Sequence, residues 1–236
     1  MYIGKRTSGP SLISEIVRVT PDGKEVLFAT LPASAPDATG ILGLVTDPPG
    51  NVFAAFVSGD PSTRGVYRVG RNGTPVERLA GSEQITFANA LTFDDDGNLY
   101  ASDSYAGKIW QFDGVGFTEW LQHPLLESVP PPGAPSIPGV NGIAFYPPNK
   151  LYAANTSQGV ISTLFIGDDG SFDGIGPVAG GFLLFTVDGI AIDVHENIYG
   201  LLAVANAEEI GAPPLPPIVK VDPHTGSITP LLTDVS

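Results

Sequence analysis

The chain has 236 residues, of which 42% are apolar and 15% charged, a balance typical of a packed globular protein and not of a disordered chain. Its 25 acidic and 11 basic residues give a net charge of −14, which argues against a nucleic-acid partner and against binding to an anionic membrane surface. The chain has no cysteine, so disulfides, thiolate metal sites and thiol catalysis are excluded.

The first 31 residues, "MYIGKRTSGPSLISEIVRVTPDGKEVLFATL", alternate apolar runs with turn residues and predict three strands. "MYI" stands where later parts of the chain have "LYA", so these strands match the second, third and fourth of a repeating unit, whose first strand would precede Met1. The segment has no apolar stretch of a signal peptide, and no apolar run approaches the roughly 18 residues that span a bilayer. We expect a soluble protein without a leader or membrane segment in this chain.

Four phrases then repeat along the chain. They are "ILGLVTDPPGNVFAAFV" (41–57), "ANALTFDDDGNLYASDS" (88–104), "VNGIAFYPPNKLYAANT" (140–156) and "VDGIAIDVHENIYG" (187–200). Each joins a short apolar run to an aromatic or β-branched run through a polar turn, which predicts a β-hairpin. We interpret "DDDG" (94–97) as such a turn, since it lacks the spaced ligands of a calcium loop.

A third and a fourth strand follow each hairpin, for example "GKIWQF" (107–112) and then "FTEWL". Four antiparallel strands in a period of roughly 40 to 50 residues, without helical spacing, predict an all-β fold, a β-propeller. We count four whole blades and three strands of a fifth in a single domain of residues 1–236. The apolar first strand of each blade is expected to be buried on both faces by the neighbouring blades. An open arc of blades would expose two blade faces and favour self-association through them.

One position of the repeat carries polar side chains where an apolar strand begins. The equivalent residues are Leu42, Asn89, Asn141 and Asp188. Equivalent positions on successive inner strands face one axis, so the oxygens of the last three could hold a hard cation such as calcium, or another divalent cation. The Gly after Asn141 and after Asp188 would let backbones approach closely. The alternative is that these Asn and Asp side chains merely cap turns where strands begin.

The phrases at 88–104, 140–156 and 187–200 resemble the SMP-30/gluconolactonase/LRE-like family over nearly the whole chain. The resemblance implies six blades, of which this chain would lack parts at both ends, and a divalent cation, usually calcium, at one end of the channel. It implies Asn89, Asn141 and Asp188 as metal ligands, with a further Glu that would precede Met1. It also implies that Asp188 helps to activate water.

These observations lead to three hypotheses. The first is a metal-dependent hydrolase acting on a small-molecule lactone or ester, with Asp188 as catalytic residue and ligand. The second is a non-catalytic propeller that binds a small molecule or protein partner, with the Pro-rich segment "ESVPPPGAPSIPG" (127–139) as a stiff loop at the channel mouth. The third is an inactive, truncated family member. The three histidines, His123, His195 and His224, have no paired spacing and are predicted at the surface.

Overall fold

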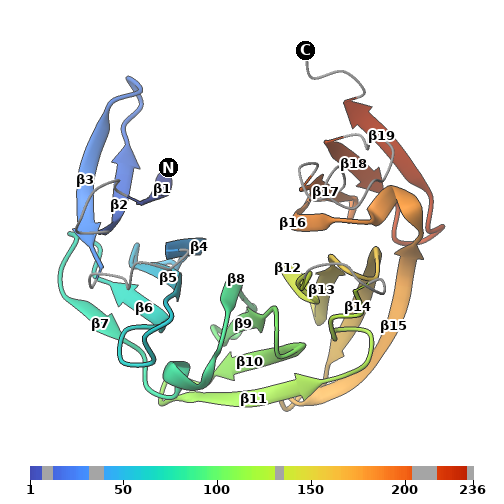
Figure 1. Ribbon diagram of the computed structural model, residues 1–236, viewed down its shortest axis with the longest axis horizontal. Helices are drawn as coiled ribbons and strands as arrows, with labels where there is room; N and C mark the ends of the chain where they lie inside the picture. The colour runs from blue at the N-terminus through green and yellow to red at the C-terminus, as the bar shows by residue number, and fades with distance from the viewer. Residues whose placement is uncertain (7–12, 32–39, 131–135, 204–216, 233–236) are drawn as a thin grey trace. The chain divides into compact units, whose positions relative to one another are not determined.

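The computed structural model describes residues 1–6, 13–31, 40–130, 136–203 and 217–232, which form an all-β fold with two short 3-10 turns (Figure 1). The described strands make five antiparallel sheets, one of three strands and four of four strands. This arrangement is a five-bladed propeller and confirms the predicted fold class. No helix in the described ranges is long and apolar enough to cross a membrane.

The chain divides into two compact units. The first unit comprises Met1–Ala101 and Trp110–Thr118, and the second comprises Ser102–Ile109 and Glu119–Ser236. The first unit holds the first two blades, whose strands are β1 (Tyr2–Arg6), β2 (Ser14–Val19), β3 (Glu25–Thr30), β4 (Gly40–Thr46), β5 (Val52–Val57), β6 (Gly65–Val69) and β7 (Val76–Arg78).

The third blade is shared between the units, and the last two blades belong to the second unit. The third blade has β8 (Ala88–Phe93), β9 (Leu99–Asp103), β10 (Lys108–Phe112) and β11 (Phe117–Gln122). The fourth has β12 (Val140–Tyr146), β13 (Lys150–Asn155), β14 (Val160–Ile166) and β15 (Phe172–Gly180), and the fifth has β16 (Val187–Ile192), β17 (Ile198–Leu202), β18 (Ile218–Val221) and β19 (Ile228–Leu232). The 3-10 turns are η1 (Ser82–Gln84) and η2 (Phe182–Leu184).

Within each blade, strands that follow one another in the chain pair side by side (Figure 1). The three strands at the start of the chain pair in the order β1-β2-β3, as predicted. Each four-stranded blade begins with a hairpin whose first strand, namely β4, β8, β12 or β16, is an edge of its sheet. This edge strand is called the inner strand below.

The second strand of each complete blade is more deeply buried than the inner strand. Every residue of β5 and β9 is buried, whereas most residues of β4 and β16 are half-buried or exposed. The expectation that inner strands are buried on both faces is therefore wrong for β4 and β16, whereas the first four residues of β12 are buried. The reason is that an inner strand pairs on one side only, while the second strand is paired on both sides and covered by apolar side chains above and below.

The apolar core lies between the faces of adjacent blades. In the first unit one cluster joins the first two blades and includes Ile16, Phe56 and Val69, and another joins β5 and β6 to the third blade and includes Phe53, Leu99 and Trp110. In the second unit a cluster containing Tyr152, Ile161, Val187 and Val219 joins the last two blades. Burying each large apolar side chain contributes about 1.5–3 kcal/mol before the entropy cost, so these interfaces hold the blades together.

Candidate functional site

The polar position of the repeat lies at an irregularity in the inner strands. In the second unit the β12–β13 register shifts between Val140 and Ile143, and the β16–β17 register shifts between Val187 and Ile190. Asn141 and Asp188 each fall within one of these shifts. An irregularity of this kind turns a side chain away from the regular pleat. The β4–β5 register shifts in the same way between Ile41 and Gly43, at the equivalent Leu42, so the irregularity belongs to this position of the repeat whether its side chain is polar or apolar.

Neighbouring inner strands touch at the same position. A Cβ atom placed on Gly142 would lie 2.4 Å from the carbonyl oxygen of Asp188, so β12 and β16 meet through bare backbone. In the first unit a Cβ on Gly43 would lie 2.1 Å from the carbonyl oxygen of Asn89. The repeat therefore places Asn89 against β4 as it places Asp188 against β12, and it brings Asn141 and Asp188 together on adjoining strands.

The prediction that a glycine lets neighbouring backbones approach closely holds for Gly142 and not for Gly189. Gly142 is enclosed by the backbone of β16, as expected, because only a residue without a Cβ fits there. A Cβ atom placed on Gly189 would meet no atom of the described residues within 4 Å, so close packing does not account for this glycine.

Asn141 is buried, with 5% of its surface exposed, and it is held at both its backbone and its side chain. The hydroxyl of Ser102 donates a hydrogen bond to the carbonyl oxygen of Asn141 at 2.7 Å. The Asn141 amide nitrogen donates to Thr156 Oγ1 at 3.0 Å. The Ser102 bond thus holds the backbone of Asn141, and the Thr156 bond orients its side-chain amide.

The carboxylate of Asp188 is half-buried, and burial raises its pKa above the usual value. Among the described residues, none donates a hydrogen bond to this carboxylate or forms an ion pair with it. A carboxylate that is partly removed from water and has no partner is costly, and a bound cation would remove that cost. Asp188 thus has the electrostatic character of a cation ligand.

The described part of the chain contains no cluster of three or more His, Asp or Glu side chains arranged to hold a metal ion. A cation at Asp188 would consequently depend on amide, carbonyl and water oxygens for its other contacts, a donor set that suits calcium. Asn89, the third predicted ligand, belongs to the first unit, while Asn141 and Asp188 belong to the second. A joint site of the three residues stays a prediction.

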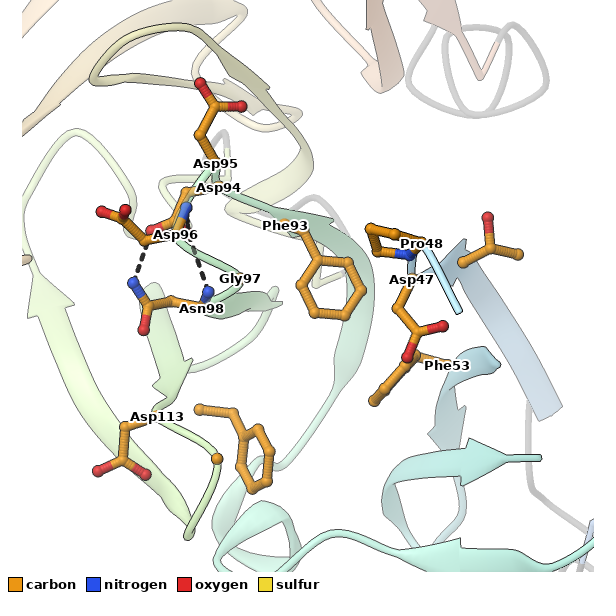
Figure 2. Close-up of a pocket in the computed structure, with 13 residues that line it drawn as sticks. Asp47, Pro48, Phe53, Phe93, Asp94, Asp95, Asp96, Gly97, Asn98 and Asp113 are labelled. Atoms are coloured by element: carbon orange, nitrogen blue, oxygen red, sulfur yellow. Dashed lines mark hydrogen bonds between the residues drawn. The ribbon is translucent and has the colours of Figure 1, made fainter. Parts of the chain in front are cut away.

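A cavity of about 660 Å³ lies in the first unit, between the hairpin turns of the second and third blades (Figure 2). Phenyl rings and carboxylates surround it, including Phe53 and Phe93, which meet edge to face with centroids 5.1 Å apart. It lies at the far end of β8 from Asn89, because its lining begins at Phe93 and continues through the "DDDG" turn. The cavity is therefore separate from the predicted metal position.

The "DDDG" segment is a hairpin turn, as predicted. Asp94 accepts hydrogen bonds from the backbone and side-chain nitrogens of Asn98, both at 2.8 Å (Figure 2). The same pairing recurs between Asp47 and Asn51 and between Asp193 and Asn197. In this motif the first Asp closes the turn, so its carboxylate is already occupied by hydrogen bonds from its own blade.

The Pro-rich segment, predicted over residues 127–139, lies partly outside the described residues. Its first part is attached to the fourth blade. Asn155 Nδ2 donates to the carbonyl oxygens of Leu125 and Glu127, and the backbone nitrogen of Val129 donates to Ser157 Oγ at 2.9 Å. Asn155 and Ser157 thus anchor this connection to the fourth blade.

Sequence reasoning missed a polar cluster between the last two blades. Glu196 is 8% exposed in its side chain, and its carboxylate lies 2.5 Å from Lys150 Nζ and 3.3 Å from His224 Nε2. Glu196 has a φ of +67°, and the matching positions in the second and third blades are Gly50 and Gly97. A Glu where these two blades have Gly was the available signal, because a left-handed conformation costs a side-chain-bearing residue free energy.

No protein-family model matches the chain, and no curated protein matches it. Solved structures do match it. A structure of a nidogen/laminin complex gives a TM-score of 0.64 at 14% identity, covering 96% of this chain and 76% of that chain. Virginiamycin B lyase from Staphylococcus aureus gives 0.59 at 14% identity, covering 98% of this chain and 70% of that chain. A gluconolactonase from Xanthomonas campestris gives 0.60 at 16% identity, covering 92% and 70%.

At these identities the similarity shows the fold alone. The matched proteins include two enzymes and a complex between proteins, which agrees with the general finding that one fold hosts many functions. The chain thus has a β-propeller fold whose structural neighbours include a gluconolactonase and virginiamycin B lyase.

Proposed function

We propose that this chain is a metal-dependent hydrolase of small lactones or esters, with a divalent cation, calcium in the first instance, held at Asn141 and Asp188. The observation that carries the proposal is the half-buried carboxylate of Asp188, which lies in a β-bulge beside Asn141 and has no partner among the described residues. The structural similarity to a gluconolactonase supports the choice of substrate class.

The chemistry divides between the two residues. When bound, the cation would polarise a carbonyl oxygen and lower the pKa of a bound water. Asn141 contributes a neutral amide oxygen, which leaves the positive charge of the site uncompensated. Asp188 contributes the carboxylate of this pair, and the carboxylate can take up the proton of the attacking water. The sequence pattern adds Asn89 as a further oxygen ligand, and its part in the site is tested by substitution.

The test compares the full chain in EDTA and in calcium, with melting temperature and hydrolysis of a panel of lactones and esters as readouts. Calcium should raise the melting temperature, since a ligand that binds only the folded state stabilises it, and hydrolysis should require calcium. Asp188→Ala should abolish both effects, while Asp95→Ala, an exposed carboxylate in a turn, should change neither. Asn141→Ala and Asn89→Ala should each weaken calcium binding about tenfold or more.

Two outcomes would contradict the proposal. Hydrolysis that is indifferent to EDTA and to Asp188→Ala would remove the metal-dependent mechanism. Calcium binding without hydrolysis of any compound in the panel would instead favour the alternative of a non-catalytic binding propeller.

The substitution Asp188→Asn separates the charge of this residue from its shape. Because burial raises the pKa of Asp188, the ionised carboxylate destabilises the cation-free fold, and this cost appears as the pH rises through the raised pKa. In EDTA at neutral pH the Asn variant should therefore melt at a higher temperature than the wild type. In calcium the order should reverse.

A further inference from the structure

Thr156 links the two residues of the proposed cation site. It follows the last residue of β13 and is buried, with 1% of its surface exposed. Its hydroxyl donates to the carbonyl oxygen of Val187 at 2.7 Å and accepts from the amide nitrogen of Asn141 at 3.0 Å. One side chain of the fourth blade thus contacts Asn141 in its own blade and the residue before Asp188 in the next.

The chemistry of these bonds fixes which end of the Asn141 amide faces Thr156. A carbonyl oxygen can only accept a hydrogen bond, so the single proton of the Thr156 hydroxyl is committed to Val187. The group of Asn141 that faces the hydroxyl must therefore be the donor, the NH₂ group. Because the amide is planar, its oxygen is turned away from Thr156. Only this end can contact a cation, since an NH₂ group would repel it.

The backbone of Thr156 also holds the segment of chain that leads into Asp188. The Thr156 carbonyl oxygen accepts a hydrogen bond from the backbone nitrogen of Thr186 at 3.1 Å, and the Thr186 carbonyl accepts one from Ala203 at 2.9 Å. Thr186 is fully buried and has a φ of +68°, an unfavourable conformation for a β-branched residue. The hydrogen bonds on both sides hold this strained turn in place, two residues before Asp188.

We propose that Thr156 is a positioning residue, whose hydroxyl orients the Asn141 amide oxygen toward the cation and fixes the chain that carries Asp188. The inference rests on the proposed function. It extends that function by naming a residue that does not contact the cation yet determines its affinity.

The experiment measures calcium affinity by calorimetry on the full chain, beginning from the EDTA-treated protein, with circular dichroism melts as the check on folding. Thr156→Val keeps the shape and removes the hydroxyl, and it should weaken calcium binding about 10- to 100-fold. Thr156→Ser keeps the hydroxyl and should bind within about threefold of the wild type. Thr156→Ala, whose side chain is smaller, provides the same measurement if the Val variant does not fold.

A matched control separates positioning from the general loss of a buried hydroxyl. Ser162 lies in β14 of the same blade, is 1% exposed, and its hydroxyl has no hydrogen-bond partner among the described residues. Ser162→Ala should leave calcium affinity unchanged. A lower affinity in Thr156→Val, rescued in Thr156→Ser and absent in Ser162→Ala, would support the inference.

Failure of the inference on Thr156 can be distinguished from failure of the proposed function. If the wild type binds calcium and Thr156→Val and Thr156→Ala bind it as tightly as Thr156→Ser, Thr156 is not a positioning residue, and the proposed function stands. If the wild type binds no calcium, the proposed function fails and the inference fails with it.

Discussion

The hydroxyl of Tyr152 donates a hydrogen bond to the carboxylate of Glu196 at 2.6 Å, from β13 of the fourth blade to the β16–β17 turn of the fifth. In the third and fifth blades the equivalent tyrosine bonds within its own blade, Tyr100 to Asp94 and Tyr199 to Asp193. The fourth blade has Tyr146 where those aspartates stand. Its tyrosine therefore takes a carboxylate from the neighbouring blade, which makes this contact a connection between blades.

Replacing Glu196 by Gln should lower the free energy of unfolding by about 1–3 kcal/mol. The substitution keeps the shape and an oxygen that can accept from Tyr152, but it leaves the ammonium of Lys150, which is 28% exposed, without its counter-charge. Urea denaturation followed by circular dichroism would measure the change.

The control for this substitution is Glu119→Gln. Glu119 pairs with Lys108 at 2.6 Å, but its side chain is 43% exposed, so the variant should lose less than about 0.5 kcal/mol. Equal and small losses in the two variants would show that the buried Glu196 cluster does not strengthen the contact between the last two blades.

The contribution of Glu196 to the free energy of unfolding should also depend on pH. Burial alone would raise the pKa of Glu196, but the hydrogen bonds from Lys150 and Tyr152 and the nearby positive charges outweigh it and hold the pKa below its usual value of 4.5. A carboxyl group whose pKa is lowered by folding stabilises the fold above its unfolded pKa, and this stability is lost as the pH falls through the folded pKa. The stability difference between wild type and Glu196→Gln should therefore be constant above about pH 5 and shrink below pH 4.5.

The measurement is a series of urea denaturations of both proteins from pH 7 to pH 3. Other carboxyl groups titrate in this range in both proteins, and their effects cancel in the difference. A difference that stays the same down to pH 3 would mean that the charge of Glu196 does not produce the stabilisation.

The strands and their order were predictable from sequence because each blade repeats the same local pattern. The position of Asn89, Asn141 and Asp188 was predictable as a register, since a repeat of four-stranded blades places equivalent residues at equivalent places on the inner strands. The Glu196 cluster was not, because Lys150 and Glu196 are 46 residues apart and their pairing depends on two blades that each depart from the repeat. The bulges at Asn141 and Asp188 leave no trace in the alternation of apolar and polar residues.

Replacing Gly142 by Ala should destabilise the protein severely, by about 3 kcal/mol or more, or prevent folding. The new methyl group would lie 2.4 Å from the carbonyl oxygen of Asp188 and 2.7 Å from the backbone nitrogen of Ile190, and backbone atoms cannot move aside as a flexible side chain can. Thermal melts and the yield of folded protein would measure the effect.

Gly189→Ala is the matched control, because Gly189 holds the equivalent place in the fifth blade and a Cβ atom there meets no described residue within 4 Å. Its stability should change by less than about 1 kcal/mol. If Gly142→Ala were as stable as Gly189→Ala, the close approach of β12 and β16 at the proposed cation site would be wrong.

Two of the three consecutive aspartates of the third blade should differ sharply in how much they contribute to stability. Asp94 accepts hydrogen bonds from Asn98, Tyr100 and the backbone nitrogen of Asp96, so Asp94→Ala should cost about 1–3 kcal/mol of unfolding free energy. Asp95 is exposed and makes no side-chain hydrogen bond to a described residue, and Asp95→Ala should change stability by less than about 0.5 kcal/mol.

Measuring the stability of both variants with and without calcium also tests the alternative interpretation of "DDDG" as a calcium loop. A hairpin turn predicts that calcium leaves the gap between the two variants unchanged, whereas a gap that widens on adding calcium would mean that the turn itself binds the ion.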